Sequence, residues 1–166
     1  MLTRARGRRG AAGVVGVVAG CLLLSGCGAE ILPLVAVEQD TRGGFTAVLR
    51  PCGDDLITGL SLFGTHGDPE QNLSGWDTTV DRSGADARFP LFSPPAGWRA
   101  APVGPQRVVP GYTYELAFGK AVPNYEYTGT VTFTAKNLST LKPGQVWADG
   151  KAMSLGEFEK LAEDSC

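Results

Sequence analysis

The sequence predicts a mainly β protein, an antiparallel β-sandwich followed by a short C-terminal helix. Short runs rich in Val, Leu, Phe and Tyr recur along the chain and are separated by turns about every ten residues, a pattern typical of all-β folds. One run, 125–136, alternates apolar and polar side chains, which predicts a strand with one buried face. The last residues instead repeat apolar side chains at helical spacing.

The first half of the domain contains four of these runs. Residues 34–38 and 45–49 flank a turn that contains two adjacent glycines, and glycine readily takes the positive φ that tight hairpin turns require. A further strand is expected at 57–63, and a weaker one at 76–80. The sequence therefore predicts an antiparallel start to the sandwich.

The second half contains the clearest strands, at 112–118 and 125–136. Two shorter runs, 145–147 and 151–153, flank an Asp-Gly pair, which is a strong hairpin signal. Ser154 follows, with Glu157 three residues later, and this spacing predicts a capping box at a helix start. The helix would bury one face, made by Leu155, Phe158, Leu161 and Ala162.

The stretch 89–110 differs from the rest because it contains six prolines. Proline cannot donate a hydrogen bond to a neighbouring strand, so this stretch is expected to be loop or sheet edge. It also contains Phe92 and Trp98, the best candidates in the chain for an exposed contact surface. A long ordered loop of this kind either carries function or covers an open sheet edge.

The N-terminus has the order of charges found in secretory signals. Residues 1–9 contain four arginines and no acid, and residues 11–24 are uncharged and small or apolar. The apolar run is short for a transmembrane helix. We therefore expect a leader that directs export.

The leader ends in Leu24-Ser25-Gly26-Cys27, which resembles the lipobox of bacterial lipoproteins. The resemblance implies cleavage between Gly26 and Cys27 and a diacylglyceryl group on the Cys27 thiol. Two acyl chains hold a protein stably at a membrane. An ordinary cleaved signal and twin-arginine export are the alternatives.

The resemblance divides the chain into a signal peptide (1–26), a lipidated cysteine with a short tether (27–33) and one domain (34–166). It places that domain on the outer face of the cell membrane. Abundant Gly, Ala, Pro and Arg resemble the composition of small extracytoplasmic lipoproteins from high-GC Gram-positive bacteria.

Cys52 and Cys166 remain once the leader is removed and Cys27 is lipidated. In an oxidising compartment they most simply pair with each other, and two free thiols or a redox pair are the alternatives. The order Cys52, Trp76, Cys166 resembles that of immunoglobulin domains in a general way. Because Cys166 follows a helix, the familiar bridge between the two sheets is not implied.

Charge excludes one class of partner. Four of the 15 Lys and Arg residues lie in the leader, so 11 remain against 17 acids, a net charge of −6. Such a domain is repelled by nucleic acid. A membrane or envelope protein is the expected partner.

No catalytic or metal-binding motif is evident. The single histidine, His66, lies between glycines, and no serine or cysteine stands in a nucleophile motif beside it. No set of His, Cys, Asp or Glu residues has the spacing of a zinc site or of a calcium loop, so we expect no cofactor.

The sequence thus favours a non-enzymatic binding or protein-interaction module, with Phe92 and Trp98 contacting the partner. A Trp98→Ala variant is then expected to weaken capture without lowering the melting temperature. The alternative is a small envelope enzyme, or an accessory subunit of one, that uses His66 and Asp68.

Overall fold

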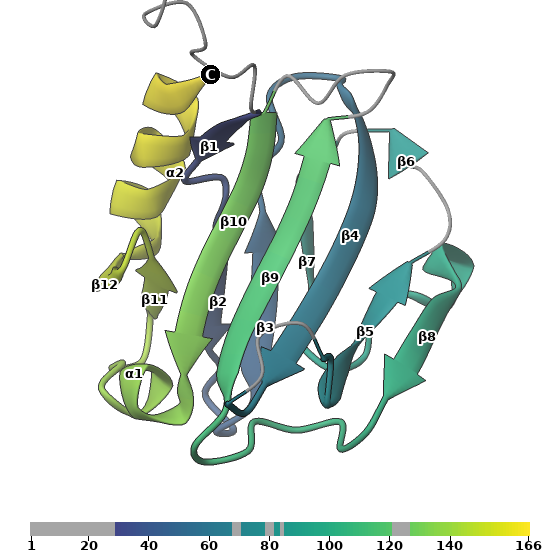
Figure 1. The fold of residues 1–166 in the computed structure, drawn as a ribbon. Helices are drawn as coiled ribbons and strands as arrows, with labels where there is room; N and C mark the ends of the chain where they lie inside the picture. Colours follow the sequence, from purple (N-terminus) through teal and green to yellow (C-terminus); the bar gives the residue numbers. More distant parts are fainter. Residues whose placement is uncertain (1–28, 68–70, 79–81, 84, 121–126) are drawn as a thin grey trace, which may run out of the picture.

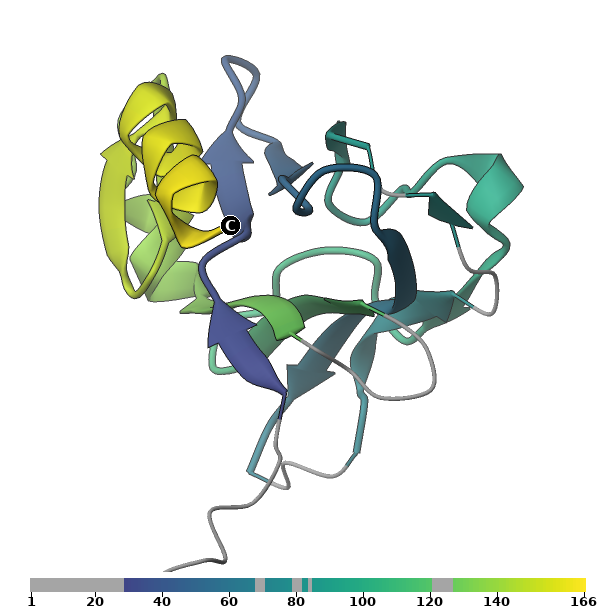
Figure 2. The same cartoon turned by 90° about the horizontal axis from the view of Figure 1, so that it is seen from above.

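Two β-sheets pack against each other and enclose a single core (Figure 1). The computed structural model describes residues 29–67, 71–78, 82–83, 85–120 and 127–166. Helix α2 (Leu155–Ser165) lies beside the hairpin of the second sheet, as Figure 2 shows from above. The predicted β-sandwich with a short C-terminal helix is confirmed. Cys27 and the predicted signal peptide lie outside the described residues.

The first sheet has seven strands within the described residues, in the order β1-β10-β9-β4-β5-β8, with β6 beside β4. Every pairing is antiparallel except that of β1 with β10. β1 and β8 are therefore the two outer strands. The strands are β1 (Glu30–Leu32), β4 (Leu56–Thr65), β5 (Ser74–Thr78), β6 (Arg82–Ser83), β8 (Ala100–Val103), β9 (Thr113–Lys120) and β10 (Tyr127–Thr134).

The second sheet has five strands within the described residues, in the order β12-β11-β2-β3-β7, and all of its pairings are antiparallel. The glycine turn joins β2 to β3, and the Asp-Gly pair joins β11 to β12, as the sequence predicted. The strands are β2 (Val35–Gln39), β3 (Phe45–Leu49), β7 (Ala87–Pro90), β11 (Gln145–Ala148) and β12 (Lys151–Ser154).

Part of the expected tether is a strand. Residues 30–32 form β1, which pairs in parallel with the start of β10, and Glu30 lies opposite Tyr127. Sequence patterns did not indicate this strand because it is three residues long and two of its three side chains are exposed. The chain is thus fixed to the sheet two residues before Leu34 enters the core.

The alternation in the predicted strand 125–136 is confirmed over the described residues, but the strand ends earlier. Tyr127, Gly129, Val131 and Phe133 are buried, whereas the threonines between them are more exposed. Helix α1 (Ala135–Ser139) begins directly after Thr134, whose side chain accepts a hydrogen bond from the Asn137 backbone N–H. The Asn137 side chain accepts one from the Thr134 N–H, which completes a capping box.

The proline-rich stretch 89–110 supplies sheet edges, as expected, but it contains more regular structure than predicted. Its first residues end β7, the outer strand of the second sheet, and 100–103 form β8, the outer strand of the first. A 3-10 helix, η1 (Ala96–Trp98), lies between them. Pro90 and Pro102 are tolerated in these strands because each strand has a partner on one side only.

Helix α2 starts with the predicted capping box. Ser154 Oγ accepts a hydrogen bond from the Glu157 N–H at 3.2 Å, and the Glu157 carboxylate accepts one from the Ser154 N–H at 2.7 Å. Phe158 and Ala162 are buried, and Leu155 and Leu161 pack against the core. The backbone hydrogen bond from Ser154, with a second from its hydroxyl, lowers the pKa of Glu157 below 4.5.

A Glu157→Gln change is expected to destabilise the protein most at neutral pH. Because the pKa of Glu157 is lowered by folding, its contribution is present above about pH 4.5 and is lost as the pH falls through the lowered value. Thermal unfolding at pH 7 and at about pH 3 measures this difference between variant and wild type. Glu163→Gln, in the last turn of α2 and distant from Ser154, is the control; an equal pH effect there would contradict the assignment.

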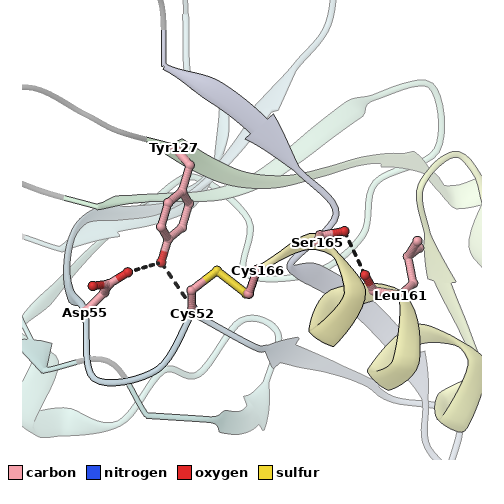
Figure 3. Close-up of a disulfide and its surroundings, with 6 residues drawn as sticks. All are labelled: Cys52, Asp55, Tyr127, Leu161, Ser165 and Cys166. Atoms are coloured by element: carbon pink, nitrogen blue, oxygen red, sulfur yellow. Dashed lines mark hydrogen bonds between the residues drawn. A yellow bond between two sulfur atoms is a disulfide. The ribbon is translucent and has the colours of Figure 1, made fainter.

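A disulfide joins Cys52, in the loop after β3, to Cys166 at the end of α2 (Figure 3). The predicted pairing is confirmed. The Tyr127 hydroxyl accepts a hydrogen bond from the Cys52 N–H and donates one to Asp55 Oδ2, both at 3.2 Å. The bridge attaches α2 to the turn between β3 and β4, and it does not link the central strands of the two sheets as an immunoglobulin disulfide does.

Candidate binding groove

His66 does not form part of a catalytic arrangement within the described residues. It lies just after β4, is exposed, and stacks on Tyr112 with ring centroids 5.4 Å apart. Among the residues that the structure describes, His66 makes no hydrogen bond to a carboxylate, a hydroxyl or a thiol. Asp68, its predicted acid–base companion, lies outside the described residues.

Carboxylates do not gather into a metal site in the part of the chain that the structure describes, where no group of three or more metal-ligating side chains occurs. The Asp55 carboxylate instead accepts a hydrogen bond from the Tyr127 hydroxyl near the disulfide. A cavity of about 360 Å³ with several charged side chains lies beside Cys166, but its Arg50 pairs with Glu159 at 2.7 Å and Asp86 at 3.4 Å. These charges satisfy one another and attach α2 to the second sheet.

The two predicted contact aromatics, Phe92 and Trp98, are half-buried rather than protruding. Trp98 packs edge-on against Phe89 with centroids 4.9 Å apart, and Phe92 packs edge-on against Tyr114 at 5.9 Å. Both rings attach the proline-rich segment to the core. Phe92 lines a groove beside this segment, whereas Trp98 is not among the residues that line it and instead contacts Phe89.

A groove of about 360 Å³ lies between residues 92–96 of the proline-rich segment and two strands, β5 and the outer strand β8. Its floor is Trp76, which is 1% exposed and donates its indole N–H to the Leu91 carbonyl at 2.8 Å. The walls are mostly small and apolar, with Arg99 and Gln106 as the long polar side chains. The lining includes Trp76, Phe92, Pro95, Arg99, Pro102 and Gln106.

Hydrogen bonds from the sheet hold the far wall of this groove in place. The Gln106 side chain donates to the carbonyls of Gly75 at 2.8 Å and Val103 at 3.0 Å. Ser74, which is fully buried, donates its hydroxyl to the Pro105 carbonyl at 2.6 Å. The Tyr114 hydroxyl, 3.0 Å from that of Ser74, donates to the Arg107 carbonyl. A groove held this way is formed before any ligand arrives, which reduces the entropy lost on binding.

Arg99 stands out on the rim because its backbone is in the left-handed region, with φ 51° and ψ 46°. That conformation is costly for a residue with a side chain, by about 1 kcal/mol or more. Arg99 is exposed and makes no ion pair within the described residues. The fold thus holds an unpaired cation at the groove despite the backbone strain.

Sequence reasoning selected the proline-rich segment but missed Arg99 and Gln106. One signal was available: the stretch 87–114 contains three arginines and no acid, in a chain whose domain is acidic overall. Of those arginines, Arg88 pairs with Glu38 of the second sheet, whereas Arg99 faces the groove. The positive rim is therefore a local exception to the charge of the molecule.

Trp98→Ala is expected to lower stability, contrary to the expectation from sequence. The change removes the edge contact with Phe89 and exposes part of the core, at a cost of about 2 kcal/mol for a half-buried ring. Equilibrium unfolding in urea measures it. An unchanged midpoint would show that the ring contributes no packing energy, and it would again favour a contact role for Trp98.

Comparison with protein-family models, with curated proteins and with solved structures finds no match. No helix within the described residues is long and apolar enough to span a membrane. The fold and groove define the class of the molecule, a two-sheet β-sandwich with a preformed cleft at one sheet edge.

Proposed function

We propose that this protein is a lipid-anchored, extracytoplasmic binding module that captures a partner protein of the cell envelope in the groove at β8. The leader and lipobox support the anchor at Cys27. The groove supports the binding role because it is preformed and largely apolar, and because Arg99 on its rim makes no ion pair with any residue that the structure describes.

The arrangement of the first sheet carries the proposal. β1 and β8 are opposite edges of that sheet, with β10, β9, β4 and β5 between them. Neighbouring strands are about 4.8 Å apart, so the groove lies about 24 Å across the sheet from the strand nearest the anchor. Only Gly28 and Ala29 separate Cys27 from β1. A lipid on Cys27 would hold one edge at the membrane and leave the groove at the other edge accessible to a partner.

Labelling with an alkynyl fatty acid tests the anchor. The wild-type protein should incorporate the label and sediment with membranes, and Cys27→Ala should do neither. Labelling of Cys27→Ala at the wild-type level would exclude Cys27 as the lipidated residue.

Photocrosslinking in cells tests the groove. Ala96 is exposed and lines the groove, so a photoreactive residue there should yield one specific protein adduct. The matched control is Ala152. It is also an exposed alanine, but it lies in β12 of the second sheet. The same adducts from both positions, or none from position 96, would contradict the proposed binding surface.

A further inference from the structure

We infer that the groove binds an extended segment of a partner polypeptide that presents an apolar side chain next to a carboxylate, and that Arg99 pairs with that carboxylate. The inference rests on the proposed function, because it takes the groove as the binding surface. It adds the chemistry of the occupant and the residue that selects it.

Charge complementarity gives the first argument. The domain has 17 acids against 11 basic residues after the leader, yet the rim of the groove has Arg99 and no acid in the surrounding stretch 87–114. An exposed guanidinium such as that of Arg99, which has no ion pair in the described part of the chain, is suited to bidentate recognition of a carboxylate. An anionic group is therefore expected to bind here rather than elsewhere on an acidic surface.

The shape and composition of the groove give the second argument. Its floor is the buried Trp76, and Phe92 and Pro95 contribute apolar walls, so it offers room for an apolar side chain beside the cation. The groove runs beside β8, an outer strand, where an extended chain finds space to lie. Pro102 removes one backbone donor from that strand, so side-chain contacts in the groove have to supply the specificity.

The backbone of Arg99 gives the third argument. Glycine adopts φ 51° without strain, so Gly is the residue that stability alone would favour at this position. Arginine is less stable there but supplies the cation. Strain that persists at a ligand-facing position is typical of a residue kept for binding.

Selection from a random peptide library tests the inference, with the purified full-length protein as target. The selected peptides are expected to contain Asp or Glu next to an apolar residue. Individual peptides should bind Arg99→Glu and Arg99→Gly at least about tenfold more weakly than wild type, the loss expected for one charge-assisted pair. Arg99→Lys should retain part of the affinity because it keeps the charge without the bidentate geometry.

Two further measurements separate binding from folding. Arg99→Gly is expected to raise the melting temperature while it weakens binding, and these opposite signs exclude general unfolding as the cause. Arg42→Glu is the matched charge control, since Arg42 is an exposed arginine in the hairpin between β2 and β3 of the second sheet. It should leave peptide affinity unchanged.

The outcomes distinguish this inference from the proposed function. Peptides without acids, no selectable peptide at all, or equal binding to Arg99→Glu would overturn the inference. Selective retention of inorganic polyphosphate or of vesicles containing anionic lipid, lost in Arg99→Glu, would also overturn it and point to a phosphate ligand. A specific adduct from position 96 that persists in Arg99→Glu would keep the binding module and reject the carboxylate. Acidic peptides without any adduct in cells would keep the groove chemistry and reject the cellular role.

Discussion

Replacing Cys52 and Cys166 together with serine is expected to lower the free energy of unfolding by about 4–5 kcal/mol. The two cysteines are 114 residues apart in sequence, so the bridge restricts nearly the whole unfolded domain. In the native state it attaches the end of α2 to the turn after β3, beside the Tyr127 hydroxyl. Guanidinium unfolding followed by tryptophan fluorescence measures the change as a lower midpoint.

Chemical reduction provides the control for this variant. A reducing agent should bring the wild-type midpoint down to that of the Cys52→Ser, Cys166→Ser protein, and it should not affect the double variant. A loss below about 1 kcal/mol would show that α2 is held mainly by its packing. That packing comes from the buried side chains of Phe158 and Ala162, and the ion pair between Arg50 and Glu159 adds to it.

Gly75→Ala is expected to destabilise the protein by at least about 3 kcal/mol, because the added methyl group overlaps main chain rather than a movable side chain. Gly75 lies in β5 opposite Phe63 of β4, with φ 147°, and a Cβ there would overlap the Leu62 carbonyl oxygen. The change would force β4 and β5 apart. Since the Gly75 carbonyl also accepts the Gln106 amide, the wall of the groove should loosen as well.

Gly97→Ala is the matched control for this substitution. Gly97 lies in η1, and a Cβ there meets no atom within 4 Å, so its change in unfolding free energy should stay within about 1 kcal/mol. Thermal unfolding of both variants measures the contrast. Equal stability of the two proteins would contradict the close approach of β4 and β5.

The parts of the fold that were predictable from sequence are those that depend on local patterns. The alternation through Tyr127 and Phe133 indicated a strand with one buried face, and the spacing of Ser154 and Glu157 indicated the start of α2. The short helix α1 was missed although Thr134 and Asn137 also form a capping box. The alternating pattern of β10 runs into its first turn and obscured it.

The edge strands could not be predicted in the same way. β1 and β8 contain three and four residues, and Pro102 argues against a strand when the neighbours are unknown. Each of them exists because a longer strand, β10 or β5, supplies its hydrogen bonds. Pairing between distant segments is a property of the tertiary structure and leaves little trace in the sequence of the shorter partner.

The candidate site shows the same division. The sequence indicated the proline-rich segment and named Phe92 and Trp98, and the structure places both rings on the core, with only Phe92 lining the groove. Arg99 was not selected because an exposed arginine is ordinary in sequence. Its left-handed backbone and its position beside Trp76 become apparent only after folding.

By itself, the sequence determined the fold class, the hairpins, the cap of α2 and the pairing of Cys52 with Cys166, because each follows from short-range periodicity, turn chemistry or the count of cysteines. Only the tertiary structure decided that β1 and β8 form opposite edges of the first sheet. It also decided that a preformed groove lies at the edge formed by β8. The physical reason is that a groove is made by segments distant in sequence, whose contacts are set by the packing of the whole core.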